Sequence, residues 1–317
     1  MIDSGPPRRS LSGAIGWFAV SYALAIVGFL GTNALAARAL GPAAFGTFVI
    51  VYTISVVIGQ VGLLGVHRAG VREVARLTRF DDSQARGLRD DVRTVSLTSL
   101  PLVSVVASGT AAALFAGDLD KPLVFGGSTA ALMYLSGQQK LASGYLRGLG
   151  CVGLAGMLEG RSGGGLIALS QAIFLALLLL WHSAPSVSTV LLAVAAAHLA
   201  PVAWGHHVIR RHWRTGPPVS GHATRLIAIV RRDWRFSLLS IAASASQYVE
   251  VWVGGLVLTA SDSSYFSASH RLASLLVIPL ASLQVICSPA ISRMWEQRSL
   301  TALTGLVRTA ATLASLS

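Results

Sequence analysis

Long apolar runs that alternate with short basic segments constrain this chain more than any other feature. A helix needs about 20 mostly apolar residues to cross the roughly 30 Å hydrocarbon layer of a membrane. Most of the runs come near that length, and they predict eight complete spans and the start of a ninth. The predicted spans are residues 14–37, 45–66, 94–116, 122–146, 166–181, 187–204, 236–259 and 272–291, and the ninth begins near Leu300.

Composition excludes an ordinary water-soluble protein. Charged residues make up 12% of the 317 residues, about half the fraction that is typical of soluble domains. The mean hydropathy is +0.64. We therefore predict an all-α polytopic membrane protein. Residues 148–165 contain eight glycines and interrupt the apolar signal, so a short helix or a loop is expected before the fifth span.

The basic residues predict an orientation. Two segments between spans, residues 67–93 and 205–235, carry seven arginines each, whereas the segments on the opposite side carry few, such as Arg38 and Lys121. Because Arg and Lys accumulate on the cytoplasmic side of membrane proteins, the N-terminus is expected inside the cell. The net charge of +12 is then explained by anionic membrane lipid, and no nucleic-acid partner is expected.

Enzymatic motifs are missing from the sequence. The two cysteines, Cys151 and Cys287, form no metal-binding pair, and no phosphate-binding glycine loop, nucleophile elbow or HExxH motif occurs. His206, His207 and His212 lie beside arginines without cysteine or acidic partners, which favours an interfacial role over a metal site. We expect no enzyme, no catalytic residue, no metal and no cofactor.

Several local motifs resemble one known family. The run Leu40-Gly41-Pro42-Ala43-Ala44-Phe45-Gly46-Thr47-Phe48 resembles the LGPxxFGxF element of polysaccharide-synthesis flippases. These Wzx-type O-antigen flippases belong to the multidrug/oligosaccharidyl-lipid/polysaccharide exporter superfamily. Further similar elements follow in family order: residues 62–65 with Arg68 and 71–76, the LRGLG run at 146–150, residues 265–273, and residues 288–293 with Pro279 before them.

The resemblance implies a two-lobe architecture. Residues 1–205 would form a complete six-helix lobe, residues 206–235 a basic cytoplasmic linker, and residues 236–317 an incomplete second lobe, as in a fragment or a truncated product. The implied location is the bacterial inner membrane, with the N-terminus in the cytoplasm. The implied cargo is a lipid-linked oligosaccharide, flipped outward by alternating access. Polysaccharide polymerase or assembly proteins are further expected partners.

Polar residues inside the predicted spans are the candidate cavity residues, because such groups usually face a cavity or a partner. By resemblance, Arg271 would bind the diphosphate of the cargo, and the alternative is an interfacial arginine. Glu250 is the proton-coupling candidate, with Ser240, Ser244 and Gln247 before it at helical spacing, and the alternative is a structural ion pair. Gln247 is also a candidate cavity residue. The other candidates, for which snorkelling or helix–helix hydrogen bonds are the alternatives, are Lys140, Gln138, Gln139, Asn33 and Gln60.

Three other functions remain open from the sequence. A cation-coupled multidrug exporter of the same superfamily would typically line its pocket with acids, whereas the named intramembrane charges here are mostly basic. A membrane-embedded glycan polymerase or ligase usually has a large outer loop, and all the predicted outer loops are short. A membrane scaffold without transport activity is the third alternative.

Overall fold

The computed structural model describes residues 11–76, 83–114, 121–159, 164–212 and 222–276, together with residues 304, 305, 308 and 312. All the regular elements in these residues are helices, and they contain no strand. Three helices are long and apolar enough to cross a membrane: Ala23–Val61, Gln84–Ala113 and Val187–Arg211. The described part of the chain therefore has the all-helical character expected of a membrane protein.

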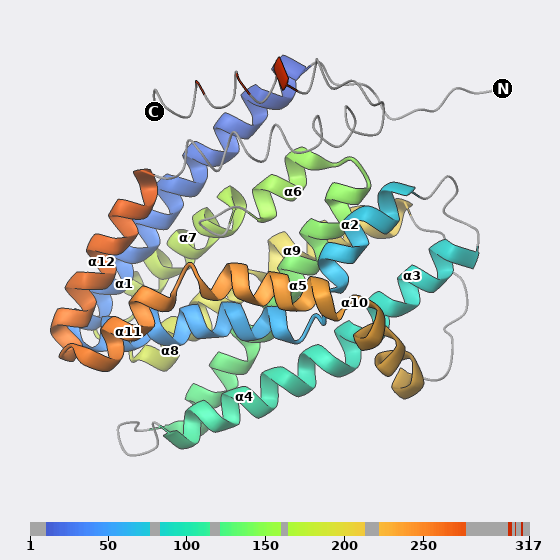
Figure 1. Ribbon diagram of the computed structural model, residues 1–317. Helices are drawn as coiled ribbons and strands as arrows, with labels where there is room; N and C mark the ends of the chain where they lie inside the picture. The colour runs from blue at the N-terminus through green and yellow to red at the C-terminus, as the bar shows by residue number, and fades with distance from the viewer. Residues whose placement is uncertain are drawn as a thin grey trace.

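Helix α1 (Leu11–Val61) consists of two arms that meet at Gly41. Gly41 has φ 72° and ψ 173°, in a region that glycine adopts without the clash of a Cβ. Pro42 follows directly and can start a helix because its missing N–H is not needed there. The chain changes direction at this point (Figure 1). The arms correspond to the first two predicted spans, so the LGP motif closes the bend between them.

Two charged helices follow α1 where a basic inner segment was predicted. They are α2 (Val66–Arg76) and α3 (Ser83–Thr94). On α2, Arg68 and Arg72 are exposed while Ala69 and Val74 are buried, as in an amphipathic helix. The third predicted span continues α3 as a short π-helical stretch η1 (Val95–Ser99) and then α4 (Leu100–Leu114).

Helix α5 (Pro122–Gly148) lies at the centre of the fold, and its bounds are close to those of the fourth predicted span. The short helix α6 (Val152–Leu158) confirms the expectation for the glycine-rich residues 148–165. Helix α7 (Gly165–Trp181) matches the fifth span. The sixth span is divided at residues 197–198 into α8 (Val187–Ala196) and α9 (Leu199–His212).

The last part of the described chain differs from the expected pattern of spans. Helix α10 (His222–Ala245) begins inside the segment predicted as a linker. A turn at residues 246–248 then interrupts the predicted seventh span, and α11 (Val249–Val257) follows. The predicted outer loop at 260–270 is wrong, because these residues form most of α12 (Ala260–Leu276). Most of the eighth span and the start of the ninth lie outside the described residues.

Two apolar clusters hold these helices together around α5. One gathers Tyr145 and Leu146 of α5 with Leu63, Val66 and Leu158. The other gathers Phe125 and Leu132 of α5 with Phe45, Phe48 and Leu191. Close approach of α2 to α5 requires a glycine, since a Cβ at Gly144 would clash with the carbonyl of His67. This contact places polar residues of α2 beside the C-terminal part of α5.

Candidate functional site

The C-terminal part of α5 carries a compact group of charges. The Nζ of Lys140 lies 2.8 Å from Oε1 of Glu159, and Nη2 of Arg147 lies 3.3 Å from Oε2 of the same carboxylate. The side chains of Lys140 and Glu159 are only 20% and 16% exposed. Burial raises the pKa of the Glu159 carboxyl, but the two cations outweigh it and hold this pKa well below its usual range. Glu159 is therefore ionised, and the three side chains carry a net charge of about +1.

The two glutamines before Lys140 also have protein partners. Gln138 Oε1 is 3.1 Å from Nε2 of His206 and accepts a 3.5 Å hydrogen bond from Ser96. Gln139 donates from Nε2 to the carbonyl of Leu158. The structure thus uses Gln138, Gln139 and Lys140 to connect α5 with η1, with α9, and with α6 and the residue that follows it.

A second group of polar contacts joins the second arm of α1 and the start of α2 to α10 and α11. Gln60 Oε1 accepts hydrogen bonds from Ser240 at 3.0 Å and from Ser244 at 2.7 Å. On α11, Trp252 donates from Nε1 to Thr53 of the second arm of α1 at 3.0 Å. These residues form what we call the polar seam, which consists of Thr53, Gln60, His67, Ser240, Ser244 and Trp252.

His67 lies at one end of the polar seam and is buried. Its Nε2 is 2.9 Å from the Ser240 hydroxyl, which already donates its hydrogen to Gln60. Nε2 is therefore the donor, and the tautomer is assigned from this network. Nδ1 is buried and has no hydrogen-bond partner in the described part of the chain. Burial lowers the pKa of His67 to about 3, so the imidazole is neutral.

The polar seam also depends on close backbone contact. Gly65 has φ +82°, and a Cβ at this position would lie 2.6 Å from the backbone nitrogen of Ser237 on α10. A glycine is needed here both for the left-handed conformation and for the approach of α10. Residues 62–65, noted above as a motif, form the run GLLG. The structure therefore explains why the last residue of this run is a glycine.

The other predicted site residues lie apart from these two groups. Glu250 is in the first turn of α11 with its side chain 66% exposed, and its Oε2 is 3.0 Å from Nδ1 of His270. Ser240 and Ser244, expected near Glu250, bind Gln60 instead. The remaining positions are as follows: Gln247 is exposed in the 246–248 turn, Asn33 donates to the Phe29 carbonyl of its own helix at 2.7 Å, and Arg271 lies on α12 with its side chain outside the described residues.

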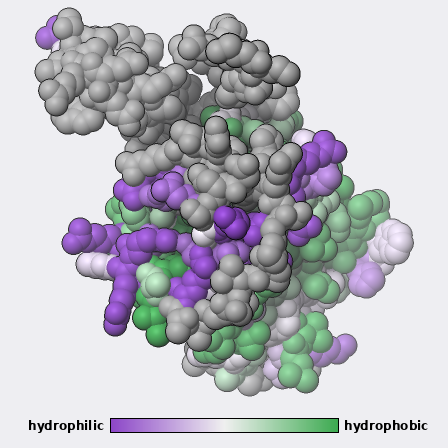
Figure 2. All heavy atoms as spheres, turned by 90° about the vertical axis from the view of Figure 1, so that its right-hand side faces the viewer, coloured by the Kyte–Doolittle hydropathy of each residue, from purple (hydrophilic) through white to green (hydrophobic). Residues whose placement is uncertain are grey.

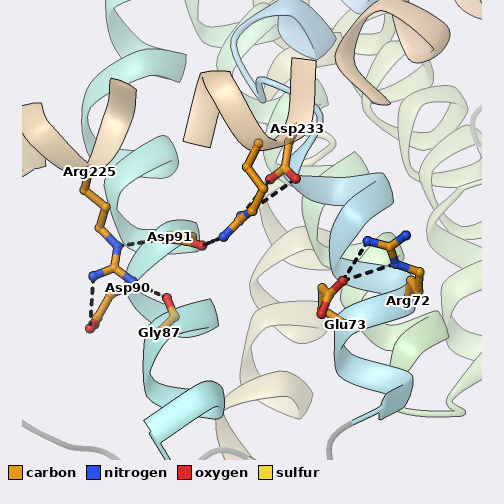
Figure 3. Close-up of polar contacts among 8 residues, drawn as sticks. Arg72, Glu73, Gly87, Asp90, Asp91, Arg225 and Asp233 are labelled. Carbon is orange, nitrogen blue, oxygen red and sulfur yellow. Dashed lines mark hydrogen bonds and ion pairs between the residues drawn. The ribbon is translucent and has the colours of Figure 1, made fainter. Parts of the chain in front are cut away.

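A third group of charges, absent from the sequence-based candidates, connects α3 to α10 (Figure 3). Asp91 Oδ1 accepts from Arg225 Nε at 2.7 Å, and Asp91 Oδ2 is 2.9 Å from Arg232 Nη1. Arg232 also pairs with Asp233 at 2.7 Å, and the hydrogen bonds that Arg232 donates to Asp233 raise the pKa of the guanidinium. We call Asp90, Asp91, Arg225, Arg232 and Asp233 the Asp91 cluster.

The three carboxylates of the Asp91 cluster are buried, whereas its arginines are partly exposed. Sequence analysis had assigned the arginines of both basic segments to anionic lipid. The structure corrects this for Arg225 and Arg232, which pair with protein carboxylates. The available signal was the pair Asp90-Asp91, since two adjacent acids in a basic segment indicate partners elsewhere.

These features define the class of the chain: an all-helical protein with helices able to span a membrane and with its polar side chains largely satisfied between helices. Within the described residues, no group of three or more His, Cys, Asp or Glu side chains is placed to hold a metal ion. No protein-family model, no curated protein and no solved structure matches the chain. The resemblance to the family named above therefore rests on the quoted motifs.

Proposed function

We propose that this chain belongs to a carrier that flips a polyprenyl-diphosphate-linked oligosaccharide across the bacterial inner membrane, from the inner to the outer leaflet. The quoted motifs support this function, and one of them lies at the bend of α1. In this proposal α1 to α9 form one lobe, and α10 to α12 begin the second. Carriers of this type bind cargo between lobes and open alternately to each side.

The observation that carries the proposal is the polar seam, because it lies where the two proposed lobes meet. Its hydroxyl, amide and imidazole groups hydrogen-bond to one another. If the lobes separate, these groups lose their partners and become free to bind sugar hydroxyls or water. The rings of Tyr248 and Trp252, with centroids 6.4 Å apart, lie at the same boundary and offer flat apolar surfaces to sugar rings.

The charged end of the cargo needs a cation. Lys140 and Arg147 share the carboxylate of Glu159, so this group offers a diphosphate only a net charge of about +1. Arg271 keeps the role proposed for it, since a guanidinium can bind two phosphate oxygens at once. Glu250 stays the proton-coupling candidate. Its pairing with His270 connects α11 to α12, so protonation of the carboxylate would weaken that connection.

A reconstituted flipping assay tests the function. The full chain is placed in proteoliposomes with a polyprenyl-diphosphate oligosaccharide, and a lectin added outside measures how much sugar crosses the bilayer. We expect protein-dependent crossing, its loss in Arg271→Ala and partial retention in Arg271→Lys. Absence of crossing in a folded protein that instead exports cationic dyes would replace this function with multidrug export.

The polar seam has a matched control. Gln60→Ala removes the acceptor shared by Ser240 and Ser244, whereas Gln171→Ala removes a buried glutamine of α7 that donates a 3.5 Å hydrogen bond to Tyr52. We expect Gln60→Ala to change the crossing rate at least tenfold and Gln171→Ala to change it little. Equal effects in proteins of equal stability would show that the polar seam is no cargo path.

A further inference from the structure

The first part of α10 has an apolar face that contacts little of the described protein. Ile227, Val230, Trp234 and Leu238 are each between 42% and 59% exposed. Their spacing of three or four residues places them along one side of the helix. Soluble proteins rarely expose such a continuous apolar surface. This stripe therefore needs an apolar environment.

The opposite side of the same helix is fixed to the protein. Ile229 and Asp233 are buried, and the Asp91 cluster holds the helix on α3 through Arg225 and Arg232. Because the buried carboxylates neutralise these two arginines, they are not free for an outside partner. The orientation of α10, and with it the exposure of the apolar stripe, follows from these ion pairs.

Two further arginines lie next to the apolar stripe. Arg231 and Arg235 are exposed, and Arg231 forms no ion pair with a described residue. The guanidinium of Arg235 lies 5.5 Å from the centroid of the Trp234 ring. The face of the molecule that carries α2, α3 and the start of α10 shows hydrophilic groups beside hydrophobic ones (Figure 2). Arginines in the bilayer centre would be costly, whereas arginine and tryptophan beside an apolar face are typical of the membrane interface.

We propose that residues 225–238 of α10 lie in the cytoplasmic interface of the membrane and that Arg231, Trp234 and Arg235 bind the phosphate of an acidic phospholipid headgroup. The guanidinium groups form charge-assisted hydrogen bonds to the phosphate oxygens. Trp234 lies at headgroup depth, and the apolar stripe enters the acyl region. This inference requires a membrane but does not depend on the proposed cargo.

Quenching of tryptophan fluorescence by brominated lipid tests the site. The full chain is placed in nanodiscs of phosphatidylcholine containing either brominated phosphatidylglycerol or brominated phosphatidylcholine, and the signal of Trp234 is the difference between wild type and Trp234→Phe. We expect stronger quenching by the acidic lipid. This preference falls about fivefold for each arginine removed in Arg231→Gln and Arg235→Gln, and it weakens as salt is added.

The control is the double variant Arg210→Gln/Arg211→Gln, which removes two exposed arginines of α9. It changes the net charge as much as Arg231→Gln/Arg235→Gln but should leave the preference of Trp234 unchanged. An equal loss in the control pair, or no preference in the wild type, overturns the site. Displacement of the brominated acidic lipid by equimolar polyprenyl diphosphate would assign the site to the cargo instead and overturn the phospholipid proposal.

Discussion

The ammonium group of Lys140 lies 2.8 Å from the carboxylate of Glu159, and this contact joins the C-terminal part of α5 to the residue that follows α6. Lys140 is the one lysine inside a predicted span, and its charge is matched by protein. An anionic cargo could use Lys140 only by displacing Glu159. The pair therefore has a structural role in the described conformation.

Removal of one partner of this pair should be worse than removal of both. Glu159→Gln leaves Lys140 and Arg147 without their counter-charge in a mostly buried place, and we expect it to lower the free energy of unfolding by about 3 kcal/mol. The double variant Lys140→Met/Glu159→Gln should lose less than Glu159→Gln alone. Unfolding in detergent micelles measures both variants, and a double variant that loses as much as Glu159→Gln or more would contradict this.

His67 should make stability depend on pH. Burial lowers its pKa to about 3, whereas an unfolded histidine has a pKa of about 6.5. Between these values the unfolded chain binds a proton that the folded chain does not, so stability falls as the pH drops, by about 1.4 kcal/mol per pH unit. From pH 7 to pH 5, the wild type should lose about 2 kcal/mol more than His67→Gln. Parallel unfolding curves for the two proteins would contradict this.

The Asp91 cluster should stabilise the contact of α3 with α10 more than an exposed ion pair does. Asp91→Asn weakens the ion pairs that Arg225 and Arg232 each form with this buried carboxylate. We expect it to lower the free energy of unfolding by about 2 kcal/mol. Glu73→Gln removes the same charge from an exposed pair with Arg72, so it should cost less than about 1 kcal/mol. Thermal unfolding of the two variants compares them, and equal shifts would rule out a special role for Asp91.

Gly144 should be intolerant of a side chain. A Cβ there would clash with the backbone of His67, so Gly144→Ala should cost about 1–3 kcal/mol and loosen α2 from α5. Gly127→Ala on the same helix meets no atom within 4 Å and should be neutral or slightly stabilising, because alanine favours a helix over glycine. Chemical unfolding of the two variants measures the difference. A mild effect at Gly144 would show that α2 can shift without cost.

Cysteine labelling tests the orientation predicted from the arginines. In a background with Cys151 and Cys287 replaced by serine, a reagent that cannot cross the membrane should label Ser183→Cys and Ser261→Cys in intact cells. Gln84→Cys and Ala228→Cys should be labelled only after the cells are opened. All four positions have exposed side chains in the structure. The reverse pattern would invert the topology.

The positions of several helices were predictable because apolar length is a local property. The bounds of α5 and α7 lie within two residues of the spans predicted at 122–146 and 166–181. The breaks at residues 197–198 and 246–248 were missed. Pro201, four residues after Ala197, was an overlooked signal for the first break, because proline leaves the carbonyl four residues before it without its helical partner. Residues 246–248 contain neither glycine nor proline, so their local sequence gave no warning.

The sequence by itself determined the class of structure: apolar runs of about 20 residues require helices, because backbone groups in lipid must bond within their own segment. Only the tertiary structure decided which charges meet. Lys140 and Glu159 are 19 residues apart, and Asp91 and Arg225 are 134 residues apart. Composition cannot predict such pairs, since an ion pair depends on the distance between two atoms, and packing of the helices sets that distance.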